Sequence, residues 1–249
     1  MMESWLKFYE MLDLSNRGLT SLVGMVPEGT IKLDCSGNQL TSLEGCPSSV
    51  EILLCMRNHL TSLEGCPPVK ILRCWNNRLT SLKGCPVSVK KLYCSHNKLT
   101  SLQWCPPFAV VLYCSFNRLT SLEHCSVSVK KLYCSHNKLT SLQWCPPLAT
   151  ELSCRKNLLS SLEYCPSSVT KLFRTNKLLS EQYRKKSLEE IHAINRVKRF
   201  ARGIAIIRNL ILNKKVSYIQ ACWETYWYKP NEEGVARYAE YSYQLMFGA

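Results

Sequence analysis

The sequence lacks the hallmarks of several common protein classes. No apolar run approaches the roughly 18 residues that a membrane-spanning helix needs, so we expect no integral membrane segment. The first residues, Met1 to Lys7, have neither the basic flank nor the long apolar stretch of an export signal, and we expect none. The absence of a P-loop, of Gly-x-Gly-x-x-Gly and of His-Glu-x-x-His argues against the nucleotide and zinc sites that these motifs build.

Acidic residues are also scarce. The 249 residues include 32 Lys or Arg but only 18 Asp or Glu, which gives a net charge of +14. An excess of this size favours acidic partners, including nucleic acid. General disorder is excluded, because 46% of the residues are hydrophobic and 10% are aromatic.

Cysteine is abundant, but its spacing excludes the usual cysteine sites. The closest two of the 15 cysteines, Cys66 and Cys74, are eight positions apart, so no Cys-x-x-Cys zinc knuckle or redox pair exists. The count is odd and no export signal is expected. We therefore expect free thiols in a reducing compartment, and a cytoplasmic protein.

A repeat of about 20 residues explains the cysteines. Thr-Ser-Leu recurs seven times between Thr20 and Leu142, and an asparagine keeps the same step from Asn38 to Asn176. One unit, 89–106, fits the pattern L-x-x-L-x-L-x-x-N-x-L, with Cys94 in the third apolar slot. Fourteen cysteines fall in two slots that we expect to face a core: Cys35, Cys55, Cys74, Cys94, Cys114, Cys134 and Cys154 in the strand, and Cys46, Cys66, Cys85, Cys105, Cys125, Cys145 and Cys165 in the return.

Because of these repeat residues, the segment 12–179 resembles the leucine-rich repeat family, in the short variety whose 20-residue units occur in bacterial effectors. The Cys-Pro-x-Ser-Val and Leu-Tyr-Cys-Ser-x-Asn segments resemble repeat proteins of large DNA viruses of amoebae. The resemblance implies a parallel-strand solenoid, usually a protein-binding role, and no catalytic residues. A viral origin would place the protein in the host cytoplasm or the virion.

The repeat predicts the domain organisation. About nine coils should occupy 12–180, each with one short strand on a concave face and an extended return, because 20 residues with a Cys-Pro segment leave no room for a convex helix. Buried asparagines should satisfy backbone groups in the turns. Residues 1–11 should cap the first coil. Residues 181–249 should form a basic, aromatic-rich helical segment, beginning with an amphipathic helix, that covers the last coil or provides a second binding site.

Strand alternation predicts which side chains face outward. If Leu92 and Cys94 point inward, the concave face carries a tyrosine stripe with basic residues around it, and Ile52, Leu54, Met56 and Ile71 extend it. The candidate binding residues are Tyr93, Tyr113, Tyr133, Trp75, Lys91, Lys131, His96, Phe116, His136, Arg78, Lys98, Arg118 and Lys138.

Tyr, Trp and Arg often anchor interfaces, so this surface favours a protein partner, acidic in part. Two alternatives stay open: the tyrosines and lysines are ordinary strand-surface residues, or the basic rim and the basic C-terminal helix bind nucleic acid or another anionic surface. Residues 87–107 and 127–147 are identical over 21 positions, which indicates duplication of a two-coil block.

The sequence indicates no catalysis, cofactor or metal site. Some bacterial relatives of this repeat class carry a cysteine ubiquitin-ligase domain, but Cys222-Trp223-Glu224 lacks the expected Cys-x-Asp signature and about 70 residues are too few for that domain. We therefore predict a non-enzymatic binding module. The partner's identity and the oligomeric state do not follow from the sequence.

Overall fold

The computed structural model describes residues 11–212, with side chains from 11 to 206. The predicted N-terminal cap lies almost wholly outside these residues, as do the helices expected beyond residue 212. Nine strands of three residues follow one another along the chain: β1 (Met11–Asp13), β2 (Lys32–Asp34), β3 (Ile52–Leu54), β4 (Ile71–Arg73), β5 (Lys91–Tyr93), β6 (Val111–Tyr113), β7 (Lys131–Tyr133), β8 (Glu151–Ser153) and β9 (Lys171–Phe173).

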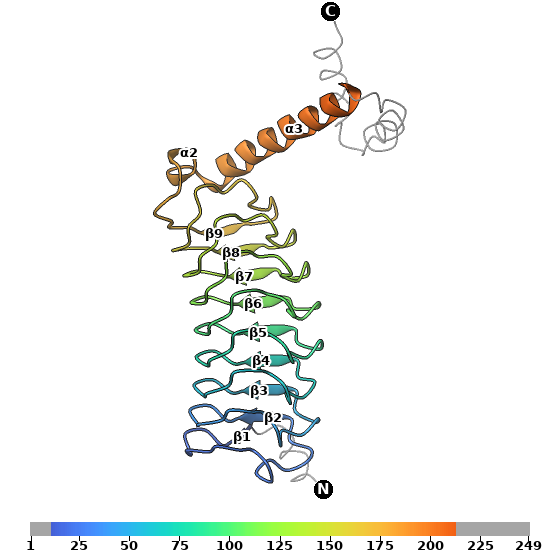
Figure 1. The fold of residues 1–249 in the computed structure, drawn as a ribbon, viewed down its shortest axis with the longest axis vertical. Coiled ribbons are helices and arrows are strands. Elements are labelled where there is room, and N and C mark those ends of the chain that lie inside the picture. The colour runs from blue at the N-terminus through green and yellow to red at the C-terminus, as the bar shows by residue number, and fades with distance from the viewer. Residues whose placement is uncertain (1–10, 213–249) are drawn as a thin grey trace, which may run out of the picture. The chain divides into compact units, whose positions relative to one another are not determined.

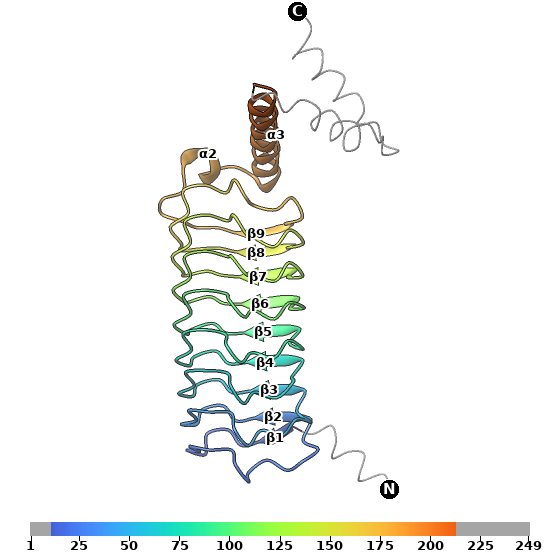
Figure 2. The ribbon, with the colours of Figure 1, turned by 45° about the vertical axis from the view of Figure 1, so that its right-hand side comes forward.

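The strands form one parallel sheet in chain order, one strand per coil, as Figures 1 and 2 show. The register repeats without a shift: Leu72 pairs with Leu92, Leu92 with Leu112 and Leu112 with Leu132. Each repeat position therefore forms a column along the solenoid. The predicted fold class is confirmed, including the helical segment that follows the repeats.

The return segments between β1 and β9 contain turns and no helix, as the short repeat predicted. One turn position has left-handed backbone in most coils, although not where Tyr164 occupies it. It is occupied by Gly45, Gly65 and Gly84 in early coils, with φ of 80–87°, but by Trp104 and Trp144 in later ones, with φ of 70° and 40°. A side chain is strained in that region, whereas glycine is not. The tryptophans are therefore costly at this position.

The solenoid interior consists of stacked leucine and cysteine columns. All seven strand-slot cysteines are buried, beside leucines that are almost wholly inaccessible. The return-slot cysteines pack against this core but are only half-buried, except for Cys165. Both slots thus contribute to the core, as predicted, although the second contributes less.

The buried asparagines join neighbouring coils, which confirms their predicted role. In a typical coil, Asn97 Nδ2 donates to the carbonyl oxygens of Cys74 (3.0 Å) and Cys94 (3.1 Å), while Asn97 Oδ1 accepts the Leu79 N–H (3.0 Å). The asparagines in the coils on either side make equivalent bonds. This ladder satisfies backbone groups that would otherwise be buried without partners.

Helical residues cover the last coil. α2 (Glu181–Arg184) precedes α3 (Leu188–Leu212), which begins with a capping box: Ser187 N–H donates to Glu190 Oε2 (2.7 Å) and Glu190 N–H donates to Ser187 Oγ (3.1 Å). Tyr183 and Ile191 join the apolar core, and Asn195 Nδ2 donates to the Leu162 carbonyl (2.8 Å). Residues 181–195 therefore shield apolar surface at this end of the solenoid.

Candidate functional site

The strand face, defined as the outward-facing residues of β1–β9 and those that follow as far as each buried asparagine, has the predicted alternation. In β5, Leu92 and the following Cys94 are fully buried, whereas Lys91 is exposed and Tyr93 is half-buried. The same order holds in β7. The repeat therefore places the candidate side chains on one surface.

The three tyrosines form a continuous stack, which we call the tyrosine column. Tyr93 and Tyr113 have ring centroids 4.8 Å apart and planes inclined by 24°, and Tyr113 and Tyr133 are 4.1 Å and 14° apart. Strand pairing sets this spacing, because Tyr93 lies opposite Tyr113 and Tyr113 opposite Tyr133. The Arg73 guanidinium lies 5.1 Å from the Tyr93 ring and covers the first ring.

Charged side chains fix the other end of the tyrosine column. The Tyr133 hydroxyl donates to Glu151 Oε1, and Lys131 Nζ lies 3.5 Å from Glu151 Oε2. Burial and this hydrogen bond raise the pKa of Tyr133, while the same bond and the nearby Lys131 charge lower the pKa of Glu151. The carboxylate is therefore ionised and the phenol neutral at pH 7.

A second stack, the corner column, consists of His96, Phe116 and His136. The Phe116 ring lies 4.2 Å from His96 and 3.9 Å from His136, with planes inclined by 11° and 16°. All three residues have left-handed backbone, with φ of 54–56°. Burial and the charge of Lys156 lower the pKa of His136, so this imidazole is neutral at pH 7.

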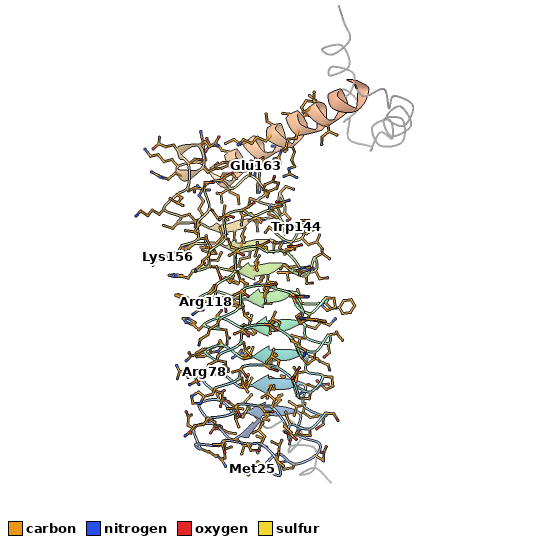
Figure 3. The ribbon with its side chains drawn as sticks, viewed as in Figure 1. Met25, Arg78, Arg118, Trp144, Lys156 and Glu163 are labelled. Carbon is orange, nitrogen blue, oxygen red and sulfur yellow. The ribbon has the colours of Figure 1, made fainter. Side chains whose placement is uncertain are left out.

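The remaining candidates do not join these stacks. Trp75 is half-buried beneath the Arg57 guanidinium, 5.2 Å from the ring centroid. The residues after four consecutive buried asparagines are exposed, and we call them the cation column: Arg78, Lys98, Arg118 and Lys138. Figure 3 places the labelled Arg78 and Arg118 along one edge of the solenoid. The candidate residues thus fall into separate columns rather than one uniform patch.

One part of the predicted patch is wrong. Leu54 lies in the outward slot of β3 but is only 9% exposed, so it adds almost no apolar surface to the strand face. Met56 is half-buried, and its sulfur accepts a hydrogen bond from Ser36 Oγ (3.4 Å). The exposed aromatic surface is therefore centred on β5–β7.

Sequence reasoning also missed a group of exposed side chains on the return segments. Trp104, Phe108 and Trp144 are 58–59% exposed, and Figure 3 shows Trp144 at the edge of the solenoid opposite Arg118. Two of them, Trp104 and Trp144, occupy the turn position that is glycine in earlier coils, and this replacement is visible in the sequence. These side chains lie away from the strand face and take no part in its columns.

The strand-slot thiols are not activated as nucleophiles. Burial raises the pKa of every strand-slot thiol; Cys154, for example, is raised to about 12, so these cysteines are poor nucleophiles. No three potential metal ligands gather within residues 11–206. Across the described helices, none has the length and apolarity needed to cross a membrane.

Comparison with known proteins identifies structural neighbours. No family model and no curated protein match this chain. Among solved structures, it is similar to YopM from Yersinia enterocolitica, with 33% identity and a TM-score of 0.61 over 67% of this chain and 38% of that one. It is also similar to YopM, a leucine-rich effector protein from Yersinia pestis, with 24% identity, a TM-score of 0.55, and coverage of 72% and 59%.

A third neighbour is a leucine-rich repeat domain of a Shigella effector, with 24% identity and a TM-score of 0.55 over 70% of this chain and 84% of that one. The chain spans 38% of the length of the first Yersinia protein and 59% of the second, less than two thirds of each. These neighbours are bacterial, so the resemblance to viral repeat proteins stays a prediction.

Proposed function

We propose that this leucine-rich repeat solenoid is a non-catalytic module that binds a protein partner, acidic in part, on its strand face. The observation that carries the proposal is the tyrosine column beside the corner column. Six stacked rings span three consecutive coils there. The likeness to effector proteins built on the same repeats supports an interaction role.

The stacks suit binding because they are ordered before a partner arrives. Tyr113 is held between two rings, so little side-chain freedom remains to be lost when it is covered. Its side chain stays half-buried on the strand face. Tyrosines held in this way provide apolar contact and hydrogen bonding at a small entropic cost.

Nucleic-acid binding is the second candidate, and the stacking geometry weighs against it. A nucleobase binds an aromatic side chain by lying on a free ring face. Both faces of Tyr113 and of Phe116 are already covered by neighbouring rings, and Arg73 covers the outer face of Tyr93. The basic residues support phosphate contact, but Tyr93, Tyr113 and Phe116 have no free ring face to offer a base.

The proposal includes no catalytic step. The cysteine outside the repeats, Cys222, lies beyond the described residues, and the strand-slot thiols are buried and protonated. A ubiquitin-discharge assay of the full chain tests this directly, and we expect no turnover. Turnover that disappears in Cys222→Ala would contradict the proposal.

A reducing, cytoplasmic location forms part of the proposal. It is supported by fourteen cysteines in core slots, where thiols pack as small apolar groups. If the resemblance to viral proteins reflects the origin of the chain, that location is the host cytoplasm or the virion.

The strand-face proposal is tested by replacing Tyr93, Tyr113 and Tyr133 with Ser in the full chain. Proteins captured by the parent chain would be purified and their direct binding measured by calorimetry. We expect the triple variant to lose at least tenfold in affinity. The matched control replaces the exposed return residues Trp104, Phe108 and Trp144 with Ser, which should leave binding unchanged. Unaltered affinity in the tyrosine variant would remove the strand face as the binding site.

A further inference from the structure

The cation column is a row of unpaired charges on the solenoid. Within residues 11–206, none of the four side chains makes an ion pair or a hydrogen bond, whereas Lys70 and Lys83 pair with Glu51 and Glu64. Figure 3 shows that this edge continues to Lys156. The four charges are thus free to meet a ligand.

The surrounding sequence does not balance these charges. Residues 52–150 contain twelve Lys or Arg and two acidic residues, Glu64 and Glu123. Both acidic residues lie in return turns, where Glu64 pairs with Lys83 (2.9 Å) and Glu123 lies 3.9 Å from His124 Nε2. Just outside this range, Glu51 pairs with Lys70, and Glu151 Oε2 lies 3.5 Å from Lys131 Nζ. The other basic residues between β4 and β7 still give this region a positive potential.

The spacing of the column selects among acidic ligands. Successive parallel strands lie about 4.8 Å apart, so four cations span roughly 14 Å. Along an α-helix, carboxylates at i, i+4, i+7 and i+11 span about 16 Å, because the rise is about 1.5 Å per residue. On one side of an extended peptide, four carboxylates span about 20 Å. The helix differs from the column by about 2 Å, which Lys and Arg side chains can absorb.

We propose that the cation column binds an acidic amphipathic α-helix that lies along the solenoid axis. This inference rests on the proposed function, and it names the class of partner that would contact the strand face and the adjoining cation column. The acidic stripe of the helix faces Arg78, Lys98, Arg118 and Lys138 in successive coils.

The corner column provides the apolar contact that such a helix needs. Phe116 is 42% exposed and lies two residues before Arg118, so it sits beside the cation column in the same coil. The stacked rings of His96 and His136 extend this contact to the coils on either side. A helix with leucines next to its acidic stripe would cover both columns at once.

The test measures binding of synthetic peptides to the full chain at several salt concentrations. The helical probe has Glu at i, i+4, i+7 and i+11, Leu on the adjacent face and a lactam staple elsewhere. An isomer of the same composition distributes the four Glu around the helix. A third probe places the same Glu and Leu residues in a proline-containing extended peptide, and a fourth is oligouridine of equal charge.

We expect the helical probe to bind at least tenfold more tightly than the other three. Replacing Arg78, Lys98, Arg118 and Lys138 with Gln should weaken its binding at least tenfold. The matched control replaces Lys70, Lys83, Lys90 and Lys130 with Gln, which removes the same charge away from the column, and should weaken binding less than threefold. Circular dichroism verifies that both variants are folded.

Several results would overturn the inference: equal binding of the isomer or the extended peptide, tighter binding of oligouridine, or equal loss in the control variant. These outcomes leave the proposed function standing, because that proposal is judged separately by the tyrosine variant and the captured partner. A captured partner that needs the tyrosine column but has no acidic helix at its contact would likewise refute only the inference.

Discussion

Tyr133 and Glu151 form a hydrogen bond between adjacent coils at the end of the tyrosine column. The Tyr133 hydroxyl donates to Glu151 Oε1, and Lys131 lies on the other side of the same carboxylate. The stack therefore begins under the Arg73 guanidinium and ends on an ionised carboxylate. This hydrogen bond fixes the position of the Tyr133 ring, and its strength depends on the ionisation of Glu151 and therefore on pH.

Tyr133→Phe should lower the free energy of unfolding at pH 7 by about 1 kcal/mol, because it removes a hydrogen bond to a charged but partly accessible group. Since the native pKa of Glu151 is lowered, the carboxylate's contribution is present above its unfolded pKa and is lost as the pH falls through the native value. The difference between variant and parent should therefore narrow as the pH falls below the unfolded value of about 4.3. Urea unfolding at pH 7 and at a series of lower pH values measures it, with Tyr93→Phe as the control. A difference that stays constant as the pH falls would contradict this account.

Asn97→Leu should lower the free energy of unfolding by about 3 kcal/mol. The substitution leaves the Leu79 N–H and the Cys74 and Cys94 carbonyls without the partner that they have in the native protein, and burial of such groups is costly. Urea denaturation measures the loss. The neighbouring exposed substitution Lys98→Ala should change stability by less than about 0.5 kcal/mol. Equal effects of the two substitutions would show that the asparagine ladder contributes little.

Trp104→Gly and Trp144→Gly should each stabilise the protein by about 1 kcal/mol, because both residues have left-handed backbone and exposed side chains. Tyr164→Gly is the matched control. Tyr164 occupies the equivalent position in the next coil but has no positive φ, so glycine there should destabilise the protein. Thermal unfolding measures all three. Stabilisation by Tyr164→Gly, or destabilisation by both tryptophan variants, would show that backbone strain does not decide whether glycine stabilises or destabilises the protein at this position.

The solenoid should be sensitive to alkali. Burial holds the native pKa of the strand-slot thiols above the value of about 8.5 for an unfolded chain, so the native state keeps protons that the unfolded state loses. The contribution of these thiols to the free energy of unfolding is therefore fully present below about pH 8. It falls as the pH rises, by about 1.4 kcal/mol per thiol per pH unit.

With seven such thiols, we expect cooperative unfolding below about pH 10. Thiolate absorbance at about 240 nm should rise together with the loss of the far-ultraviolet dichroism signal. Thiolates that form near pH 8.5 while the dichroism remains native would mean that the strand-slot cysteines are accessible.

The repeat period allowed the columns to be predicted, because a parallel register without shifts places the same position of every coil in line. The sequence alone therefore assigns Leu92, Cys94 and Asn97 to the interior. The stacking of Tyr113 could not be predicted in this way, since ring orientation depends on side-chain torsions and on the neighbours in adjacent coils. The same applies to Phe116, whose contact with two histidines depends on a left-handed backbone that the sequence pattern does not reveal.

Other differences arise where local and tertiary effects compete. Leu54 occupies an outward slot yet is buried, so alternation alone overestimated the apolar patch. The Ser187–Glu190 capping box is present in the sequence as Ser-x-x-Glu, but the hydrophobic period that predicts the helix does not mark its first residue. At Trp104, turn preferences would predict glycine, because the backbone is left-handed there. The strained tryptophan therefore does not follow from those preferences.

The identity of residues 87–107 and 127–147 gives the binding surface an adjustable length. Recombination between the two segments would add or remove one 40-residue block and join coils whose facing surfaces already match. Each added block would lengthen the solenoid by about 10 Å. It would add two rings to the tyrosine column and two residues to the cation column. Duplication of coils can therefore lengthen the binding surface, and with it the partner segment that the surface can contact, without any new substitution.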